Sequence, residues 1–318
     1  ARLYTGRQKI ISKYRSYHGA TYGAISAGGD PRRTPIDRDQ MPGIIHVEDP
    51  YCYRCPFGQK PESCKKECVS HIERVIRFEG PETVAAILME GESGSSGCIK
   101  YPEGYWEGID AIAKKYGILI IVDEVMSGFG RCGNWFAIQN TSVTPDLIVM
   151  AKGINSGYVP LGGVMVSKEI SDYFDDKALP LGLTYSAHAL ACASAIANIN
   201  VMKENKLPER AKELESYLVK KVGELKVAHP SIGDFRCTGL LGCIELVKDR
   251  ETREPLVPWN AKPSELGPTN KIAASLRKSG MMTFVRWNWI FIAPPLIITE
   301  AQIDEGLAMI SEAISLVE

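Results

Sequence analysis

The chain has 318 residues, 45% of them hydrophobic and 24% charged, and its 37 basic and 38 acidic residues give a formal net charge of −1. This length is more than a single core usually fills, so we expect one large domain and one smaller domain. The balanced charge argues against nucleic acid as a partner, and the composition excludes disordered, collagen-like and coiled-coil proteins. The longest aliphatic run, residues 84–89, is far shorter than the ~20 residues that cross a bilayer, so no membrane partner is expected.

The cysteine usage indicates the cellular compartment of the protein. Nine cysteines is an odd number, most lie singly in apolar stretches, and no basic and apolar leader precedes them. This usage is typical of a reducing compartment, so we expect the cytoplasm.

Residues 1–7 begin without Met and resemble the last turns of a helix. We therefore expect that the N-terminal part of the large domain is missing.

Residues 80–165 alternate short apolar runs with an amphipathic helix, which is typical of a mostly parallel sheet covered by helices. Strands are predicted at 84–89, 118–122 and 147–150, and a helix at 105–116. A second pattern begins near residue 206, with a charged helix at 208–222, a strand near 239–246 and a final helix opened by a capping box of Thr299 and Gln302. We therefore expect an α/β domain over 1–205 and an α+β domain over 206–318.

Three predicted strands end next to ionisable residues, namely Glu90, Asp123 and Lys152. Ligands of open parallel sheets bind outside the carboxyl ends of the strands, so these side chains are expected to share a crevice. A buried lysine has a lowered pKa and can form a Schiff base with an aldehyde. A carboxylate keeps a pyridinium nitrogen protonated. Lys152 and Asp123 together therefore predict a pyridoxal 5'-phosphate site.

Linked motifs in a fixed order carry a family resemblance. Residues 123–131 (DEVMSGFGR), 151–153 (AKG) and 183–188 (LTYSAH) resemble the class III (ω-amino acid) aminotransferases of the type I pyridoxal-phosphate fold. The resemblance covers nearly the whole chain. It implies a mostly parallel seven-stranded sheet sandwiched by helices, a smaller C-terminal α+β domain, and a homodimer or dimer of dimers with shared active sites.

The resemblance also implies the roles of individual residues. Lys152 resembles the Schiff-base lysine that also moves the proton, and Asp123 the acid paired with the ring nitrogen. Val125 resembles the residue packed on one face of the ring. Tyr17 and His18 belong to a Tyr-His-Gly motif whose tyrosine stacks on the other face.

Two further residues complete the cofactor site that the resemblance implies. Glu90 resembles an acidic residue near the edge of the cofactor. Thr184 resembles the threonine that reaches the cofactor phosphate of the neighbouring subunit. One departure is Met126, where family members often carry a glutamine that bonds the ring hydroxyl.

Substrate preference can be argued from two positions. Family members that use 2-oxoglutarate commonly carry a glutamate five positions after the residue matched by Glu90, but this chain has Ser95 there. The chain thus resembles the pyruvate-accepting branch. Arg286 precedes the Ala293-Pro294-Pro295-Leu296 motif as the family's carboxylate-binding arginine does, and the alternative for it is an exposed structural arginine.

Four cysteines, Cys52, Cys55, Cys64 and Cys68, have a spacing that would suit a zinc or iron–sulfur site. A similar pattern occurs in some class III relatives as a surface insertion. Three alternatives remain open for these cysteines: a bound metal, two disulfides or four free thiols. No metal is assigned to the active site.

The combined hypothesis is an aminotransferase that moves an amino group from an ω-amino donor, such as taurine, β-alanine or 4-aminobutyrate, to a 2-oxo acid, with pyruvate as the expected acceptor. The alternatives are an aminomutase or decarboxylase of the same fold, and a non-catalytic relative stapled by the four cysteines. A nicotinamide-binding protein is disfavoured because no Gly-x-Gly-x-x-Gly turn directly follows a predicted strand.

Overall fold

The computed structural model describes all 318 residues, which divide into two compact units. The first unit comprises residues 1–96, 101–129 and 134–206, and the second comprises 97–100, 130–133 and 207–318. Among the helices, none combines the length and the apolar composition that spanning a membrane requires.

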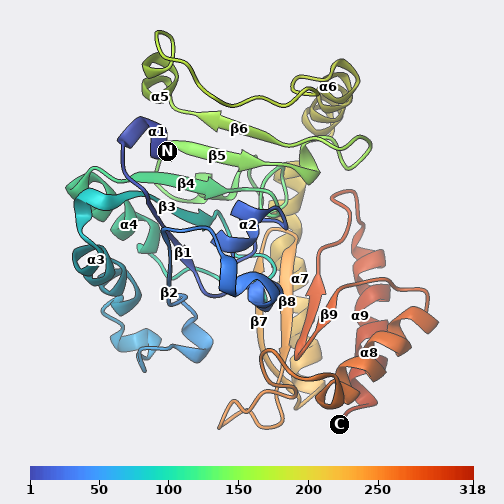
Figure 1. The fold of residues 1–318 in the computed structure, drawn as a ribbon. Helices are drawn as coiled ribbons and strands as arrows, with labels where there is room; N and C mark the ends of the chain where they lie inside the picture. The colour runs from blue at the N-terminus through green and yellow to red at the C-terminus, as the bar shows by residue number, and fades with distance from the viewer. The chain divides into compact units, whose positions relative to one another are not determined.

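The first unit contains a six-stranded sheet in the order β2-β1-β3-β4-β5-β6, in which only the β5–β6 pair is antiparallel (Figure 1). Its strands are β1 Lys9–Lys13, β2 Ile44–Val47, β3 Val84–Glu90, β4 Leu119–Asp123, β5 Leu147–Met150 and β6 Gly163–Val166. The expected mostly parallel sheet is confirmed. The expected number of seven strands is not met, because β2 and β6 form the two edges and no further segment pairs with either.

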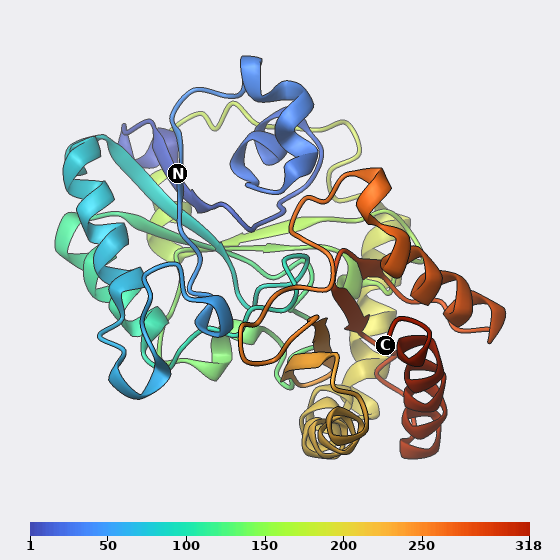
Figure 2. The same cartoon turned by 90° about the horizontal axis from the view of Figure 1, so that it is seen from below.

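Helices cover both faces of this sheet. They are α1 Arg2–Thr5, α2 Tyr22–Ala27, α3 Glu67–Glu79, α4 Tyr105–Tyr116, α5 Lys168–Tyr173 and α6 Ala189–Glu204. On one face, α3 and α4 bury Ile72, Ile109 and their apolar neighbours against the strands, and Figure 2 shows these two helices lying together. On the other face, Ala27 of α2 and Ile170 of α5 pack against small strand residues such as Ala85.

The helix α4 has the predicted bounds, 105–116, because its apolar spacing and its terminal glycine both favour a helix over these residues. Tyr105, Ile109, Ile112 and Ala113 recur on one side and are all buried. Gly117 ends the helix in the left-handed conformation with φ of 60°, which glycine adopts without steric cost.

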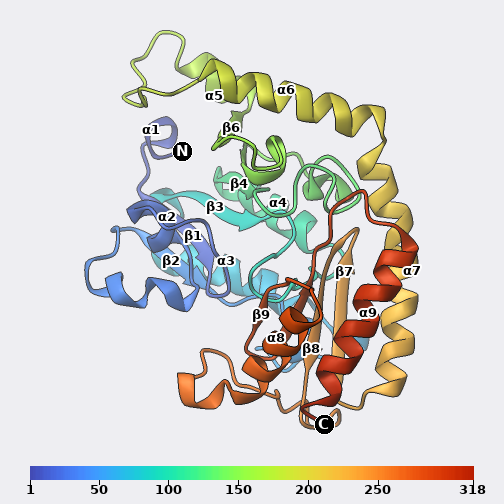
Figure 3. The same ribbon diagram turned by 90° about the vertical axis from the view of Figure 1, so that its right-hand side faces the viewer.

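The second unit has a four-stranded antiparallel sheet in the order β7-β8-β10-β9. Its elements are α7 Leu207–Ala228, β7 Ile232–Thr238, β8 Leu241–Leu246, α8 Gly267–Lys278, β9 Val285–Arg286, β10 Trp289–Ile292 and α9 Glu300–Ser315. Figure 3 shows α7 and α9 side by side, and both contribute to one apolar core with α8 and the sheet. The predicted capping box is confirmed, since Thr299 Oγ1 accepts a bond from the Gln302 amide and Gln302 Oε1 accepts one from the Thr299 amide.

Replacing Ile109 by alanine should lower the free energy of unfolding by roughly 3 kcal/mol, because the side chain is fully buried between α4 and the sheet and a cavity would remain. Urea denaturation followed by circular dichroism measures the change. Phe78→Ala on α3 is the matched control, because Phe78 is 86% exposed, and it should change stability by less than about 0.5 kcal/mol. Equal losses in the two variants would contradict the core described above.

Candidate active site

The ends of three neighbouring strands meet at one edge of the first sheet. Glu90 and Asp123 are the last residues of β3 and β4 and lie directly opposite each other in the ladder. Lys152 follows two residues after the end of β5. A cavity of about 170 Å³ at this edge is lined by Tyr17, His18, Gly19, Glu90, Glu92, Asp123, Val125, Met126 and Lys152. The structure therefore brings six of the predicted site residues together.

Lys152 is held in an unusual backbone conformation. Its φ is +43°, in the left-handed region that costs a non-glycine residue roughly 1 kcal/mol or more. The turn Lys152–Ile154 is fixed by Asn198 of α6, whose side-chain amide donates to the carbonyl oxygens of Gly153 at 2.9 Å and Ile154 at 3.2 Å. This support from α6 holds the lysine at the cavity wall.

The environment of Lys152 makes its ammonium easier to deprotonate than that of an ordinary lysine. Burial lowers the pKa of the Lys152 ammonium below its usual value, Arg32 lowers it further, and the negative charges of Asp123 and Glu90 oppose the change. A neutral amine is a nucleophile and a base, whereas an ammonium is neither. The site therefore prepares Lys152 for covalent chemistry with a carbonyl compound.

The Asp123 carboxylate is fixed by two hydrogen bonds. His18 Nδ1 lies 2.7 Å from Asp123 Oδ2, and the amide of Val125 donates to Asp123 Oδ1 at 2.9 Å. The other ring nitrogen of His18 is 3.3 Å from Ser12 Oγ. With His18 Nδ1 donating to the carboxylate, Nε2 accepts the serine hydroxyl, so both ring nitrogens have partners. Asp123 is thereby held rigidly as an anion at the cavity.

Tyr17 lies at the cavity with one face of its ring covered. The guanidinium carbon of Arg32 is 3.6 Å from the centre of the Tyr17 ring, and Arg32 Nε donates to Asp30 at 2.8 Å. A guanidinium stacked at this distance stabilises the ring by a cation–π contact. The sequence analysis did not include Arg32, although it stands in a segment with Arg33 and Arg38 that precedes β2.

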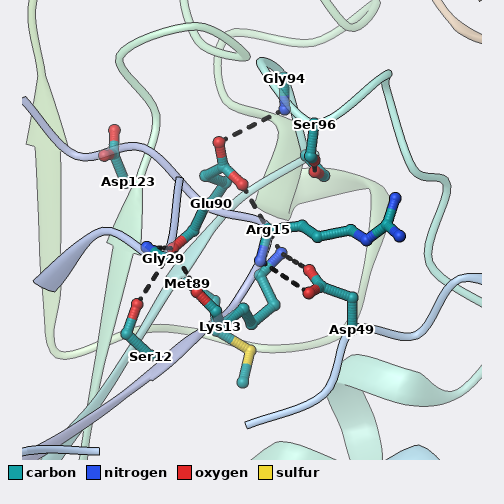
Figure 4. A network of polar contacts seen from close by, with 12 residues as sticks. Ser12, Lys13, Arg15, Gly29, Asp49, Met89, Glu90, Gly94, Ser96 and Asp123 are labelled. Atoms are coloured by element: carbon teal, nitrogen blue, oxygen red, sulfur yellow. Dashed lines mark hydrogen bonds and ion pairs between the residues drawn. The ribbon is translucent and has the colours of Figure 1, made fainter. Parts of the chain in front are cut away.

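Behind Glu90 lies a buried polar network (Figure 4). Lys13 Nζ is 3.6 Å from Glu90 Oε2 and 3.9 Å from Asp49 Oδ1. It also donates to the hydroxyl of Tyr101 at 2.6 Å, and that hydroxyl donates to the Glu90 carbonyl oxygen at 2.9 Å. The sequence analysis missed Lys13 and Asp49, because a lysine inside a strand and an acid after a strand are ordinarily solvated.

Glu124 supports the segment that follows Asp123. Its side chain is fully buried, and its carboxylate accepts the Ser127 hydroxyl and the amides of Ala137 at 3.0 Å and Ile138 at 2.8 Å. These amides start the short 3₁₀ helix Ala137–Asn140, whose N–H groups would otherwise be unpaired. Glu124 thus ties the turn after β4 to a segment more than ten residues further along the chain.

Two predicted site residues, Thr184 and Arg286, are not among those that line the cavity. Thr184 is exposed in the loop between α5 and α6 and does not line the cavity. Arg286 belongs to the second unit, at the end of β9, where its guanidinium carbon lies 3.9 Å from the centre of the Trp287 ring.

No disulfide joins any of the nine cysteines, and no group of three or more His, Cys, Asp or Glu side chains is arranged to hold a metal ion. Burial raises the pKa of the Cys68 thiol to about 12, so this thiol is unreactive near neutral pH.

Known proteins match this chain over nearly its whole length. A family model described as aminotransferase class-III matches residues 1–314. The chain belongs to the class-III aminotransferases. Among curated members of this kind, the putrescine–pyruvate aminotransferase of Pseudomonas aeruginosa is 35% identical over 95% of this chain and 65% of its own length. The leucine/methionine racemase of Thermococcus litoralis is 38% identical over 100% of this chain and 70% of its own length.

A solved class-III structure agrees closely with the fold. The taurine:2-oxoglutarate aminotransferase from Bifidobacterium kashiwanohense, in complex with PLP and glutamate, is 44% identical and has a TM-score of 0.94 over 99% of this chain and 71% of that chain. The chain therefore spans about two thirds of the length of the relatives that it matches.

Class-III aminotransferases are dependent on pyridoxal phosphate, and the cavity fits this cofactor by its chemistry. Lys152 would supply an amine for the aldehyde, and Asp123 a fixed carboxylate for the ring nitrogen. Tyr17 and Val125 provide an aromatic and an aliphatic wall suited to a flat ring.

Replacing Glu124 by alanine should lower the free energy of unfolding by about 3 kcal/mol, because two buried amides and a serine hydroxyl would lose their acceptor. Glu124→Gln keeps one acceptor oxygen and should lose less. Chemical denaturation measures both, with Glu103→Ala as a control on the exposed surface. A stable Glu124→Ala variant would show that the turn after β4 does not depend on this carboxylate.

Proposed function

We propose that the protein transfers an amino group from an ω-amino donor, of the taurine, β-alanine or 4-aminobutyrate class, to a 2-oxo acid. The observation that carries the proposal is a lysine of lowered pKa that lines one cavity with a doubly hydrogen-bonded carboxylate. Relatives support the donor class, since their names include putrescine, gamma-aminobutyrate and taurine.

Each site residue has a separate task in this proposal. Pyridoxal phosphate, when bound, supplies an electron-withdrawing ring that stabilises negative charge on the substrate carbon. Lys152 Nζ would hold the cofactor aldehyde, and as a free amine it would take the proton from the substrate carbon and deliver it to the cofactor carbon that receives the amino group. Asp123, held by His18, would keep the ring nitrogen cationic. Tyr17 and Val125 would hold the ring, and Glu90 would stand near it.

Pyruvate is the acceptor that we propose. Ser95, which is 8% exposed, stands where a glutamate would neutralise an arginine in members that take 2-oxoglutarate. Without that glutamate, Arg286 meets a single carboxylate or sulfonate. The solved relative that uses 2-oxoglutarate makes this oxo acid the second candidate. A panel of amino donors assayed with each oxo acid separates the two.

A racemase is the competing activity, because one curated relative carries that name. Racemases, aminomutases and decarboxylases need no 2-oxo acid, whereas transamination requires one in stoichiometric amount. Turnover without an added oxo acid, followed by chiral chromatography and by carbon dioxide release, would replace the proposal by one of these reactions.

Lys152→Ala should abolish turnover, because the variant has neither the amine that binds the cofactor nor the base that moves the proton. Borohydride treatment followed by peptide mass analysis should locate a reduced cofactor adduct on Lys152 in the unmodified protein and none in the variant. Lys168→Ala, at an exposed position on α5, is the control and should keep both signals. An active Lys152→Ala variant would refute the assignment, and a colourless protein without any adduct would favour a non-catalytic relative.

We further propose that the active protein is a homodimer in which Thr184 reaches the cofactor phosphate of the second subunit. The segment around Thr184 exposes several large apolar side chains, which solvent disfavours and a second subunit would cover: Leu179, Leu181, Leu183, Tyr185 and Leu190. We also propose a reducing compartment, in keeping with a cytoplasmic enzyme, because the nine cysteines are not joined in disulfides.

Leu183→Ser should weaken the dimer by at least tenfold in its dissociation constant, because it removes apolar area from the proposed interface. Sedimentation velocity over a range of concentrations measures this constant. Val227→Ser is the matched control, because Val227 is similarly exposed but lies on α7 of the second unit. A monomer at all concentrations in the unmodified protein would exclude the shared site.

A further inference from the structure

One buried lysine lies between two buried carboxyl groups. Lys13 Nζ is 3.6 Å from Glu90 Oε2 and 3.9 Å from Asp49 Oδ1, and the three side chains are 0%, 5% and 4% exposed. Figure 4 shows the two carboxyl groups on different sides of the lysine, with Asp123 beyond Glu90. An interior of low polarity does not tolerate an unbalanced charge. One ammonium balances one carboxylate, so the other carboxyl group should carry a proton.

The contacts of Lys13 are those that a lysine ammonium makes. Its amine is 2.6 Å from the Tyr101 hydroxyl, and the proton of that hydroxyl is committed to the Glu90 carbonyl oxygen. The amine must therefore donate to the tyrosine oxygen. Lys13 Nζ also lies 4.7 Å from the centre of the Tyr101 ring, where a positive charge is stabilised.

Asp49 is the better stabilised of the two carboxyl groups as an anion. Its Oδ2 accepts the Arg15 amide at 2.8 Å, and both Lys13 and Arg15 lower its pKa. Burial is the larger effect and raises the pKa of Asp49 to about 6. Asp49 is therefore mostly ionised at neutral pH and pairs with Lys13.

Glu90 has weaker support for a negative charge. Its Oε1 accepts a long 3.5 Å bond from the Gly94 amide, and its Oε2 has no hydrogen-bond partner in the protein. Asp123 stands directly opposite on β4 and repels a second anion. Burial raises the pKa of Glu90 and Asp123 raises it further, while Lys13 and His18 oppose them.

The other charged groups near Glu90 do not supply a cation that would balance a negative charge on its carboxyl group. Lys152 lines the same cavity, but it is exposed to solvent, which screens its charge, and no ion pair joins it to Glu90. Glu92, a further acidic wall residue, adds no positive charge. His18 already donates to Asp123.

We propose that Glu90 holds a proton at neutral pH and acts as the neutral hydrogen-bond donor of the cavity, and that Lys13 and Asp49 are positioning residues that keep the proton there. The Glu90 O–H is directed by this arrangement to an acceptor oxygen of the bound ligand, of the phenolic or carboxylate class. Met126, on the same wall, has a thioether that donates no hydrogen bond, so Glu90 supplies what that side chain lacks. The ligand role rests on the proposed function, but the protonation of Glu90 does not.

Isotope-edited infrared spectroscopy tests the proposal on the full chain as purified. Carbon-13 at the glutamate side-chain carboxyl shifts the carbonyl band of a protonated glutamic acid and leaves aspartic acid bands in place. The difference between unmodified protein and Glu90→Gln isolates the Glu90 band. We expect this band to be present between about pH 6 and pH 8, where an ordinary glutamate is fully ionised.

Asp49→Asn provides the decisive comparison. Asparagine keeps an acceptor for the Arg15 amide but removes the competing charge, so Lys13 should pair with Glu90 and the Glu90 band should be lost near neutral pH. Lys13→Met should keep the band and add a band from protonated Asp49. Asp172→Asn, on the exposed surface of α5, is the control and should change nothing.

Two outcomes would overturn the proposal. The first is the absence of a Glu90 band in the unmodified protein, which needs no variant other than Glu90→Gln. The second is a Glu90 band that persists unchanged in a folded Asp49→Asn variant. The infrared result is independent of turnover, so a failure of the proposed reaction would leave it standing, and the reverse is also true.

Discussion

The parallel pairing of β3, β4 and β5 is the constraint on which the site depends. The pairing places Glu90 opposite Asp123, and it brings the turn that carries Lys152 to the same edge of the sheet. Glu90 and Asp123 are buried, and burying an ionisable group is costly unless it has a partner. Most of the surrounding polar side chains offset that cost, because they form ion pairs or hydrogen bonds with the ionisable groups.

The ionisable side chains of the site differ in their partners. His18 and the Val125 amide hold Asp123 as an anion, so its charge remains available to a cationic ring nitrogen. Lys13 and Asp49 form a second pair beside Glu90. Lys152 is left with long-range attraction, and partial burial lowers the pKa of its ammonium. A network in which every group were fully paired would be more stable but would have no nucleophile.

Close packing of the loops around the site holds Lys152 and its neighbours in place. A Cβ atom on Gly153 would lie 2.7 Å from Phe129, and one on Gly94 would lie 2.6 Å from the Met126 sulfur. Such approaches need glycine, because real Cβ atoms do not come that close. The left-handed backbone at Lys152 is maintained against its cost by the same packing and by Asn198.

The sequence by itself determined the local elements and the family. The helix at 105–116 was predicted with both of its bounds, since its apolar spacing and its terminal glycine act within a few residues. The strand ends at Glu90 and Asp123 were found to within one residue, so the crevice could be expected from pattern alone. Only the tertiary structure revealed Lys13, Asp49, Tyr101 and Arg32 around the site, and it gave six strands where seven were expected. The reason is physical: whether a lysine in a strand is solvated or buried between two carboxyl groups depends on side chains that are tens of residues apart in the chain and meet only after folding.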